Sequence, residues 1–149
     1  MIAERHILPP ETLVPKILAL LEVSDAVPLV ITGSSMTPFL AHQRDIVYLS
    51  KPVRPLKRGD MIFYHRDNGQ YVLHRICKIK DGRYWLVGDA QCDIEPGIRP
   101  DQIIAVVNAV RRKGKLIKPG DVSWEFFEHL WIRMIPLRPV AFKIHSLIH

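Results

Sequence analysis

Residues 27–38 read Val-Pro-Leu-Val-Ile-Thr-Gly-Ser-Ser-Met-Thr-Pro, and residues 32–38 of this stretch are the most informative part of the chain. The apolar run Val27–Ile31 is typical of a short strand. In the turn that follows, Gly33 permits backbone angles that other residues avoid, and Pro38 fixes its own φ. A serine at the mouth of such a rigid turn is a candidate nucleophile if a base lies nearby. Ser, Gly and Pro are also the residues of an ordinary turn, so this stretch alone leaves both interpretations open.

Three later segments extend the pattern. Gly59-Asp60 precedes the apolar run Met61–Tyr64, residues 71–76 read Tyr-Val-Leu-His-Arg-Ile, and residues 87–93 read Val-Gly-Asp-Ala-Gln-Cys-Asp. The order Ser-Met-x-Pro, Gly-Asp before a strand, His-Arg and Gly-Asp resembles the signal peptidase I superfamily of serine peptidases, a clan that includes the self-cleaving phage-type repressors. The resemblance spans roughly residues 30–112, and four matched boxes in order are far more specific than any one of them.

The resemblance implies a nucleophile and a base. Ser35, directly before Met36, matches the nucleophile of the family. His74 matches the base, at a position where bacterial-type members and repressors carry lysine and the endoplasmic-reticulum and archaeal type carries His-Arg. A neutral histidine with a pKa near 6.5 serves as a base at pH 7 without heavy tuning. We therefore expect kcat/KM to fall as the pH drops through about 6–7.

The resemblance leaves the third member of the site open. Asp89, in the last Gly-Asp box, and Asp93, further along, both match the acidic positions of the His branch loosely, and Glu95 is a further candidate. One of these carboxylates is expected to accept the imidazole N–H of His74. Asp60 matches a box whose expected role is structural, in a turn before a strand.

The oxyanion hole departs from the family pattern. Many relatives place Ser or Thr two residues before the nucleophile, where this chain has Gly33. The hydroxyl of Thr32 or Ser34, or a second backbone N–H beside that of Ser35, would have to donate instead.

The length of 149 residues suits a single domain, residues 1–149. We expect this domain to be of mainly β class. We expect an N-terminal helical segment over residues 1–26, a compact antiparallel β domain of the signal peptidase and repressor-autopeptidase type over 27–118, and a C-terminal helical segment over 119–149. Runs rich in β-branched and aromatic residues, separated by Asp-Asn-Gly and Asp-Gly turns, predict the strands of the middle segment. These are Val27–Ile31, Ile46–Leu49, Met61–Tyr64, Tyr71–Ile79, Tyr84–Val87 and Ile103–Val110.

Two stretches have helical spacing. Residues 11–22 predict a short amphipathic helix, with Pro15 tolerated only in the first turn. Residues 123–135 predict a second helix that carries Trp124, Phe127 and Trp131 on one stripe. Such a stripe suits packing against the β domain or a membrane interface, and packing is the more common use.

The net charge of +6 is concentrated late in the chain, because eight Lys/Arg against three Asp/Glu from Arg111 onward account for +5. The basic cluster around Gly114 predicts a hairpin tip, either simply solvated or facing an anionic lipid surface. Nucleic acid is a minor alternative because no nucleic-acid-binding signature accompanies the charge. No apolar run reaches the ~18–20 residues that span a bilayer, and no secretory signal is evident. We expect a cytoplasmic protein, or one peripheral to the membrane alone or through a membrane partner.

Cysteine and histidine spacings favour no metal site. Cys77 and Cys92 lack Cys-x-x-Cys spacing, which is typical of two free thiols, and the histidines form no zinc-hydrolase motif. We expect neither a metal nor a cofactor.

These patterns predict a serine endopeptidase of the signal peptidase type that uses Ser35 and His74. By resemblance, its substrate is a peptide or precursor protein, presented as an extended strand and cut near small side chains. The alternative is a non-catalytic peptide-binding module that keeps the fold. A self-cleaving repressor is disfavoured, because the chain has His74 in place of lysine and contains no Ala-Gly or Cys-Gly dipeptide.

Overall fold

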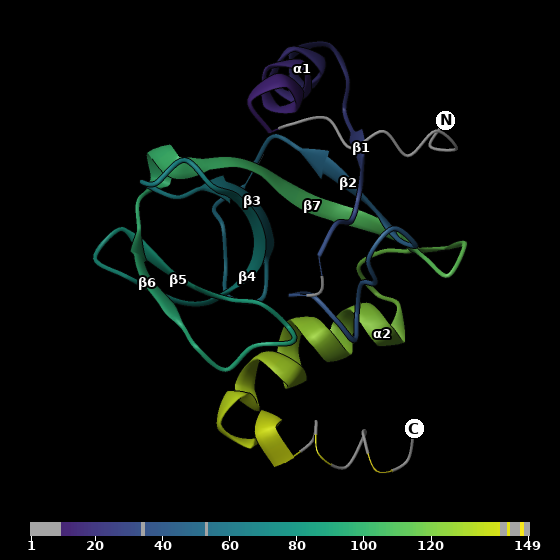
Figure 1. Cartoon of the computed structure of the whole chain (residues 1–149), viewed down its shortest axis with the longest axis vertical. Coiled ribbons are helices and arrows are strands. Elements are labelled where there is room, and N and C mark those ends of the chain that lie inside the picture. The colour runs from purple at the N-terminus through teal and green to yellow at the C-terminus, as the bar shows by residue number, and fades with distance from the viewer. Residues whose placement is uncertain (1–9, 34, 53, 141–142, 144–146, 148–149) are drawn as a thin grey trace.

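The computed structural model describes residues 10–33, 35–52, 54–140, 143 and 147, and consists mainly of one curved, antiparallel, eight-stranded sheet (Figure 1). The strands are hydrogen-bonded in the order β1-β2-β7-β3-β4-β5-β6, and β8 pairs with β7. The mainly β, antiparallel prediction is confirmed. The strands are β1 (Val27–Val30), β2 (Ile46–Ser50), β3 (Met61–His65), β4 (Tyr71–Lys80), β5 (Arg83–Val87), β6 (Glu95–Ile98), β7 (Ile103–Arg112) and β8 (Lys115–Ile117).

The predicted turns join neighbouring strands as hairpins. Gly69 has a φ of 90° between β3 and β4, and Asp81 and Gly82 have φ values of 54° and 72° between β4 and β5. Consecutive positive φ values match the right-handed twist of the flanking strands. The basic cluster forms the predicted hairpin tip, with Lys113 and Gly114 between β7 and β8.

Two strands, β6 and β8, were not predicted from the sequence. β6 contains Pro96, which reads as a loop residue, but β6 is an edge strand paired only with β5 and so tolerates the missing N–H. β8 has only three residues, too few to show an alternating pattern.

The N-terminal helix is confirmed as α1 (Pro10–Val23), which packs Val14, Ile17 and Leu21 into the core. Pro15 lies inside this helix, beyond the first turn where we expected it, and so removes one helical hydrogen bond.

The predicted C-terminal helix 123–135 is instead a series of short helical segments. They are α2 (Val122–Glu125), the π-helical η2 (Phe126–Leu130) and the 3₁₀ turns η3 (Trp131–Arg133) and η4 (Ile135–Leu137), while η1 (Pro100–Gln102) precedes β7. The carbonyl of Trp131 accepts from the Met134 N–H and from the Arg138 side chain, which ends the regular pattern there.

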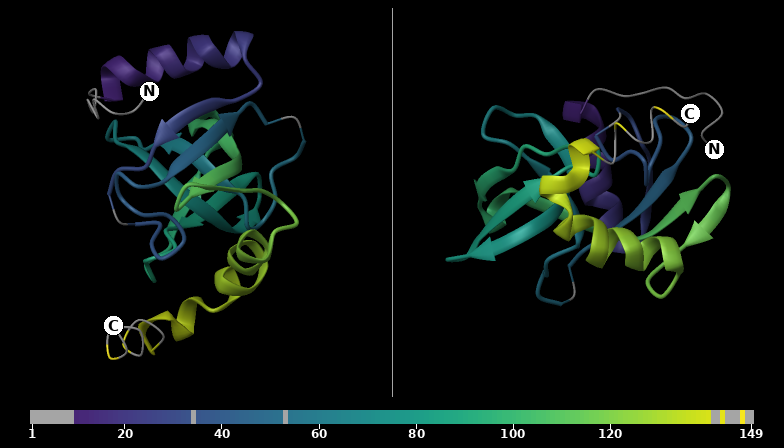
Figure 2. Two further views of the ribbon diagram at one scale, coloured as in Figure 1. Left: turned by 90° about the vertical axis from the view of Figure 1, so that its right-hand side faces the viewer. Right: turned by 90° about the horizontal axis from the view of Figure 1, so that it is seen from below.

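α1 and the C-terminal helical segments lie at opposite ends of the molecule, with the strands between them (Figures 1 and 2), and both contribute buried side chains to the same hydrophobic core. Trp124, Phe127 and Trp131 are buried in the main core, where the Phe39 ring contacts the first two. This burial overturns a membrane-interface role for these three aromatics. Among the described residues, no helix is long and apolar enough to cross a bilayer.

Candidate functional site

The Ser35 turn is anchored by the residues that follow the serine. Met36, Phe39 and Leu40 are buried in the main core, and the Leu40 N–H donates to the Met36 carbonyl over 2.9 Å. Ser35 itself stays half-buried. The apolar anchors therefore fix a half-buried serine at the edge of the core.

The loop between β5 and β6 closes on this turn. The Ala90 N–H donates to the Ser35 carbonyl over 2.8 Å. A Cβ placed on Gly88 would lie 2.4 Å from the same carbonyl oxygen, so only glycine allows this approach. The structure thus brings the backbone of the predicted nucleophile against the second Gly-Asp box.

His74 and Arg75 are adjacent in β4 and so point to opposite faces of the sheet. His74 is 3% exposed and lines a pocket of about 470 Å³. The other residues that line it are Arg66, Ala90, Gln91, Cys92, Asp93, Ile94 and Glu95. The candidate base therefore faces the same 88–95 loop that binds the Ser35 backbone.

A short hydrogen-bond chain leads away from His74. Its Nδ1 lies 3.2 Å from the Tyr64 hydroxyl oxygen, and that hydroxyl donates to Glu95 Oε1 over 2.7 Å. Arg66 Nε donates to both Glu95 carboxylate oxygens, over 3.1 and 3.0 Å. A carboxylate is thus linked to the imidazole through one phenol.

Burial controls the protonation of His74 and Tyr64, two members of this hydrogen-bond chain. Desolvation, and then the positive charge of Arg66, lower the pKa of His74 from 6.5 to about 4, while the charge of Glu95 opposes the shift. His74 is therefore neutral at pH 7, and the expected pH limb at 6–7 moves to lower pH. Burial and the bond to Glu95 raise the pKa of Tyr64, so its hydroxyl keeps its hydrogen.

The two predicted aspartates lie in different environments. Asp89 is fully buried, and Arg75 Nε and Nη2 donate to its two oxygens over 3.0 Å each. Arg75 Nη1 also donates to the Gly59 carbonyl. Asp93 lies exposed on the pocket wall. Neither carboxylate makes a hydrogen bond to His74, whereas Glu95 reaches it through Tyr64.

Asp60 has the structural role expected for it. Both of its oxygens accept from Arg54 over 2.9 Å, and one also accepts from the Lys57 N–H over 2.8 Å. These bonds fix the turn that leads into β3.

The structure gives less support to two other expected features of the site, a hydrogen bond between Ser35 and His74 and a second oxyanion donor. Within the described parts of the chain, the Ser35 hydroxyl makes no hydrogen bond to His74. Thr32 is exposed, and the Gly33 N–H is occupied by a 2.7 Å bond to His42 Nδ1. Ser34 lies outside the described residues. A second oxyanion donor therefore stays a prediction.

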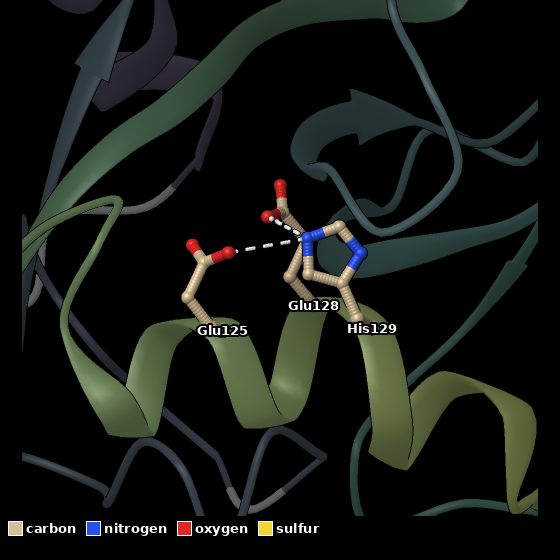
Figure 3. Close-up of side chains that lie close together, drawn as sticks. All are labelled: Glu125, Glu128 and His129. Atoms are coloured by element: carbon tan, nitrogen blue, oxygen red, sulfur yellow. Dashed lines mark ion pairs between the residues drawn. The ribbon is translucent and has the colours of Figure 1, made fainter.

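A cluster of Glu125, Glu128 and His129 has the composition of a metal site (Figure 3). His129 Nε2 lies 3.3 Å from Glu125 Oε1 and 3.0 Å from Glu128 Oε2. Lys57 Nζ also pairs with Glu128, so a cation already occupies its second oxygen. A Cβ on Gly59 would meet the Glu128 carbonyl at 2.5 Å. The cluster therefore fastens η2 to the turn before β3.

Sequence reasoning missed Tyr64 and Arg66. The Asp-Asn-Gly turn fixes the register of the β3–β4 hairpin, which pairs Ile62 with His74. Tyr64 is two residues from Ile62, so it lies on the same face as His74, in a diagonal position. Counting residues back from the turn would have found this neighbour.

Neither a scan against models of known protein families nor a search of curated proteins finds a match to this chain.

Proposed function

We propose that the protein is a serine endopeptidase of the signal peptidase type, with Ser35 as nucleophile and His74 as general base. One observation carries the proposal. A buried, neutral histidine lines a pocket whose other wall, the 88–95 loop, binds the backbone of Ser35. The two candidate residues thus adjoin one loop although they are far apart in the sequence, Ser35 through its backbone carbonyl and His74 through the pocket that it lines together with the loop.

The reaction follows from these groups. The Ser35 oxygen attacks the carbonyl carbon of the scissile peptide bond while its proton passes to His74 Nε2. Collapse of the tetrahedral intermediate breaks the C–N bond, and the imidazolium returns the proton to the leaving amine. Water then hydrolyses the acyl-enzyme with His74 as base again. A peptide or precursor protein is the substrate that the resemblance implies.

A non-catalytic peptide-binding module is favoured by one observation, the absence of a hydrogen bond between the Ser35 hydroxyl and His74. Catalytic hydrogen bonds of this kind often tighten only in the complex with substrate, so the missing bond does not exclude the reaction. The two functions make opposite predictions about the reactivity of Ser35.

An active-site acylating probe separates them. We expect covalent labelling at Ser35, identified by peptide mapping, and none in Ser35→Ala. Ser34→Ala is the matched control and should label much like the wild type. His74→Ala should slow labelling by roughly 10³-fold, because the serine loses its base. A folded wild-type protein that resists every such probe, or a Ser35→Ala variant that labels equally, would assign the binding module instead.

A further inference from the structure

The third member of the site is identified by what faces His74 Nδ1. In a serine-histidine site, a third group accepts the hydrogen of this nitrogen and so orients the imidazole. Here the facing atom is the phenol oxygen of Tyr64, at 3.2 Å. The direction of that hydrogen bond decides which nitrogen of His74 remains basic.

Counting hydrogens settles the direction. Tyr64 has one hydroxyl hydrogen, and an ionised carboxylate can only accept. Glu95 is ion-paired with Arg66, and its 2.7 Å contact with the Tyr64 hydroxyl is shorter than the contact with His74. The hydrogen of Tyr64 therefore points at Glu95, which leaves a lone pair of the phenol oxygen facing Nδ1. That contact is attractive only if Nδ1 carries the hydrogen.

We infer that Tyr64 and Glu95 are positioning residues that hold neutral His74 as the Nδ1–H tautomer, with the Nε2 lone pair left to accept a proton. The tautomer follows from geometry alone, whereas its use in proton transfer from Ser35 rests on the proposed function. The phenol thus transmits the effect of a carboxylate that does not touch the imidazole.

The other charged groups near His74 do not take this role. Arg66 holds the Glu95 carboxylate by two bonds and, as a guanidinium, can only donate, so it cannot accept the Nδ1 hydrogen. Asp89 pairs with Arg75, on the opposite face of β4 from His74, and Asp93 lies exposed on the pocket wall. Among the described residues, Tyr64 and Glu95 form the hydrogen-bonded path from Nδ1 to a carboxylate.

The tautomer is measured directly by long-range ¹H–¹⁵N spectra of the histidine-labelled protein at pH 7. In the wild type we expect a protonated Nδ1 and an unprotonated Nε2 for His74. Tyr64→Phe removes the acceptor, so the two nitrogen shifts should move toward those of a tautomer mixture. Tyr71→Phe is the matched control, since Tyr71 stacks on Phe63 away from this path, and it should change neither shift.

Two substitutions of Glu95 sharpen the test. Glu95→Leu removes the acceptor of Tyr64, which frees its hydrogen to turn toward Nδ1 and should switch His74 to the Nε2–H form. Glu95→Gln keeps an acceptor oxygen and should preserve the wild-type tautomer. A wild-type protein with Nε2–H, or a Tyr64→Phe variant with unchanged nitrogen shifts, would overturn the inference.

Activity separates this inference from the proposed function. If Ser35 is a nucleophile, Tyr64→Phe should lower kcat by roughly 10²- to 10⁴-fold at nearly constant KM, the size of effect that a wrong tautomer has in other triads. Failure of Ser35 to react with the acylating probe would remove the peptidase but leave the tautomer result standing. Full activity of Tyr64→Phe in an enzyme labelled at Ser35 would remove the positioning role alone.

Discussion

At the scale of single residues, burial gives His74 two properties at once. Desolvation keeps the imidazole neutral at pH 7, as a base requires, and also makes it a weaker base than a histidine in water. Contact with Tyr64, and through it with Glu95, favours the protonated form that arises during proton transfer. Tyr64 and Glu95 together thus partly offset the loss of basicity that burial causes in His74.

The pH dependence of the site follows from the lowered pKa. We expect kcat/KM to hold from pH 7 down to about 5 and to fall through a pKa of about 4, as His74 gains its proton. A titration of the His74 imidazole by NMR should show the same pKa. An acid limb at 6–7 in both measurements would contradict the desolvation of His74. Activity that rises only above pH ~9 would indicate a lysine base.

The same shift makes folding stability depend on pH. The folded-state pKa is below the unfolded value of 6.5, so the unfolded chain takes up the proton first as the pH falls. The contribution of His74 is complete above about 6.5 and is lost between there and about 4, with an upper bound of about 3 kcal/mol. In urea unfolding, the stability of the wild type relative to His74→Gln should fall over this range.

At the scale of elements, the site depends on contact between two loops rather than on the strands themselves. The Ser35 turn is fixed by buried Met36 and Phe39, and the 88–91 loop meets it through Ala90. Gly88 allows the close approach because a side chain there would collide with the Ser35 carbonyl. Arg138 holds the loop from behind by donating to the Gly88 and Gln91 carbonyls.

Gly88→Ala tests this contact. The added methyl must push the Ser35 turn and the loop apart, so acylation of Ser35 should slow by at least roughly 10-fold, with a stability loss of about 1–3 kcal/mol. Gly69→Ala is the control, because the space around Gly69 is open and its φ of 90° brings backbone strain alone. It should cost about 1–2 kcal/mol without slowing acylation. Equal acylation rates in the two variants would show that the contact does not position Ser35.

At the scale of the whole molecule, the buried pair of Arg75 and Asp89 joins parts that are distant in sequence. Arg75 connects β4 with the Gly59 carbonyl and with Asp89, whose own carbonyl accepts from the Trp131 indole over 2.9 Å. The Arg75 guanidinium also lies over the Phe39 ring. Sheet, site loop, Ser35 turn and C-terminal segment are thus held together at one buried ion pair.

The two aspartates predicted for the site should therefore behave differently. Asp89→Asn breaks the buried pair and should lower the free energy of unfolding by about 3 kcal/mol. Asp93→Asn alters an exposed side chain and should change it by less than about 0.5 kcal/mol, with little effect on acylation. Urea denaturation and probe labelling measure both effects. An Asp93→Asn variant of normal stability that fails to react would assign the third role to Asp93 instead of Glu95.

The sequence by itself determined the β class, the hairpin turns and the two residues on which the proposed chemistry rests. Runs rich in β-branched and aromatic residues and Asp-Gly turns are local signals, so they predicted β3, β4, β5 and β7 closely. The adjacent positions of His74 and Arg75 in a predicted strand are also a local signal. Adjacent strand residues face opposite sides, which sends His74 to the pocket and Arg75 to the core.

Only the tertiary structure shows which acidic residue is linked to His74 by hydrogen bonds. Asp89, Asp93 and Glu95 lie within seven residues of one another, and their sequence positions do not show which reaches the base. The choice depends on β6 pairing at the sheet edge, which brings Glu95 to Tyr64, and on Arg75 taking Asp89 from the other face. Such pairings between distant segments depend on packing and register, and no local pattern encodes them.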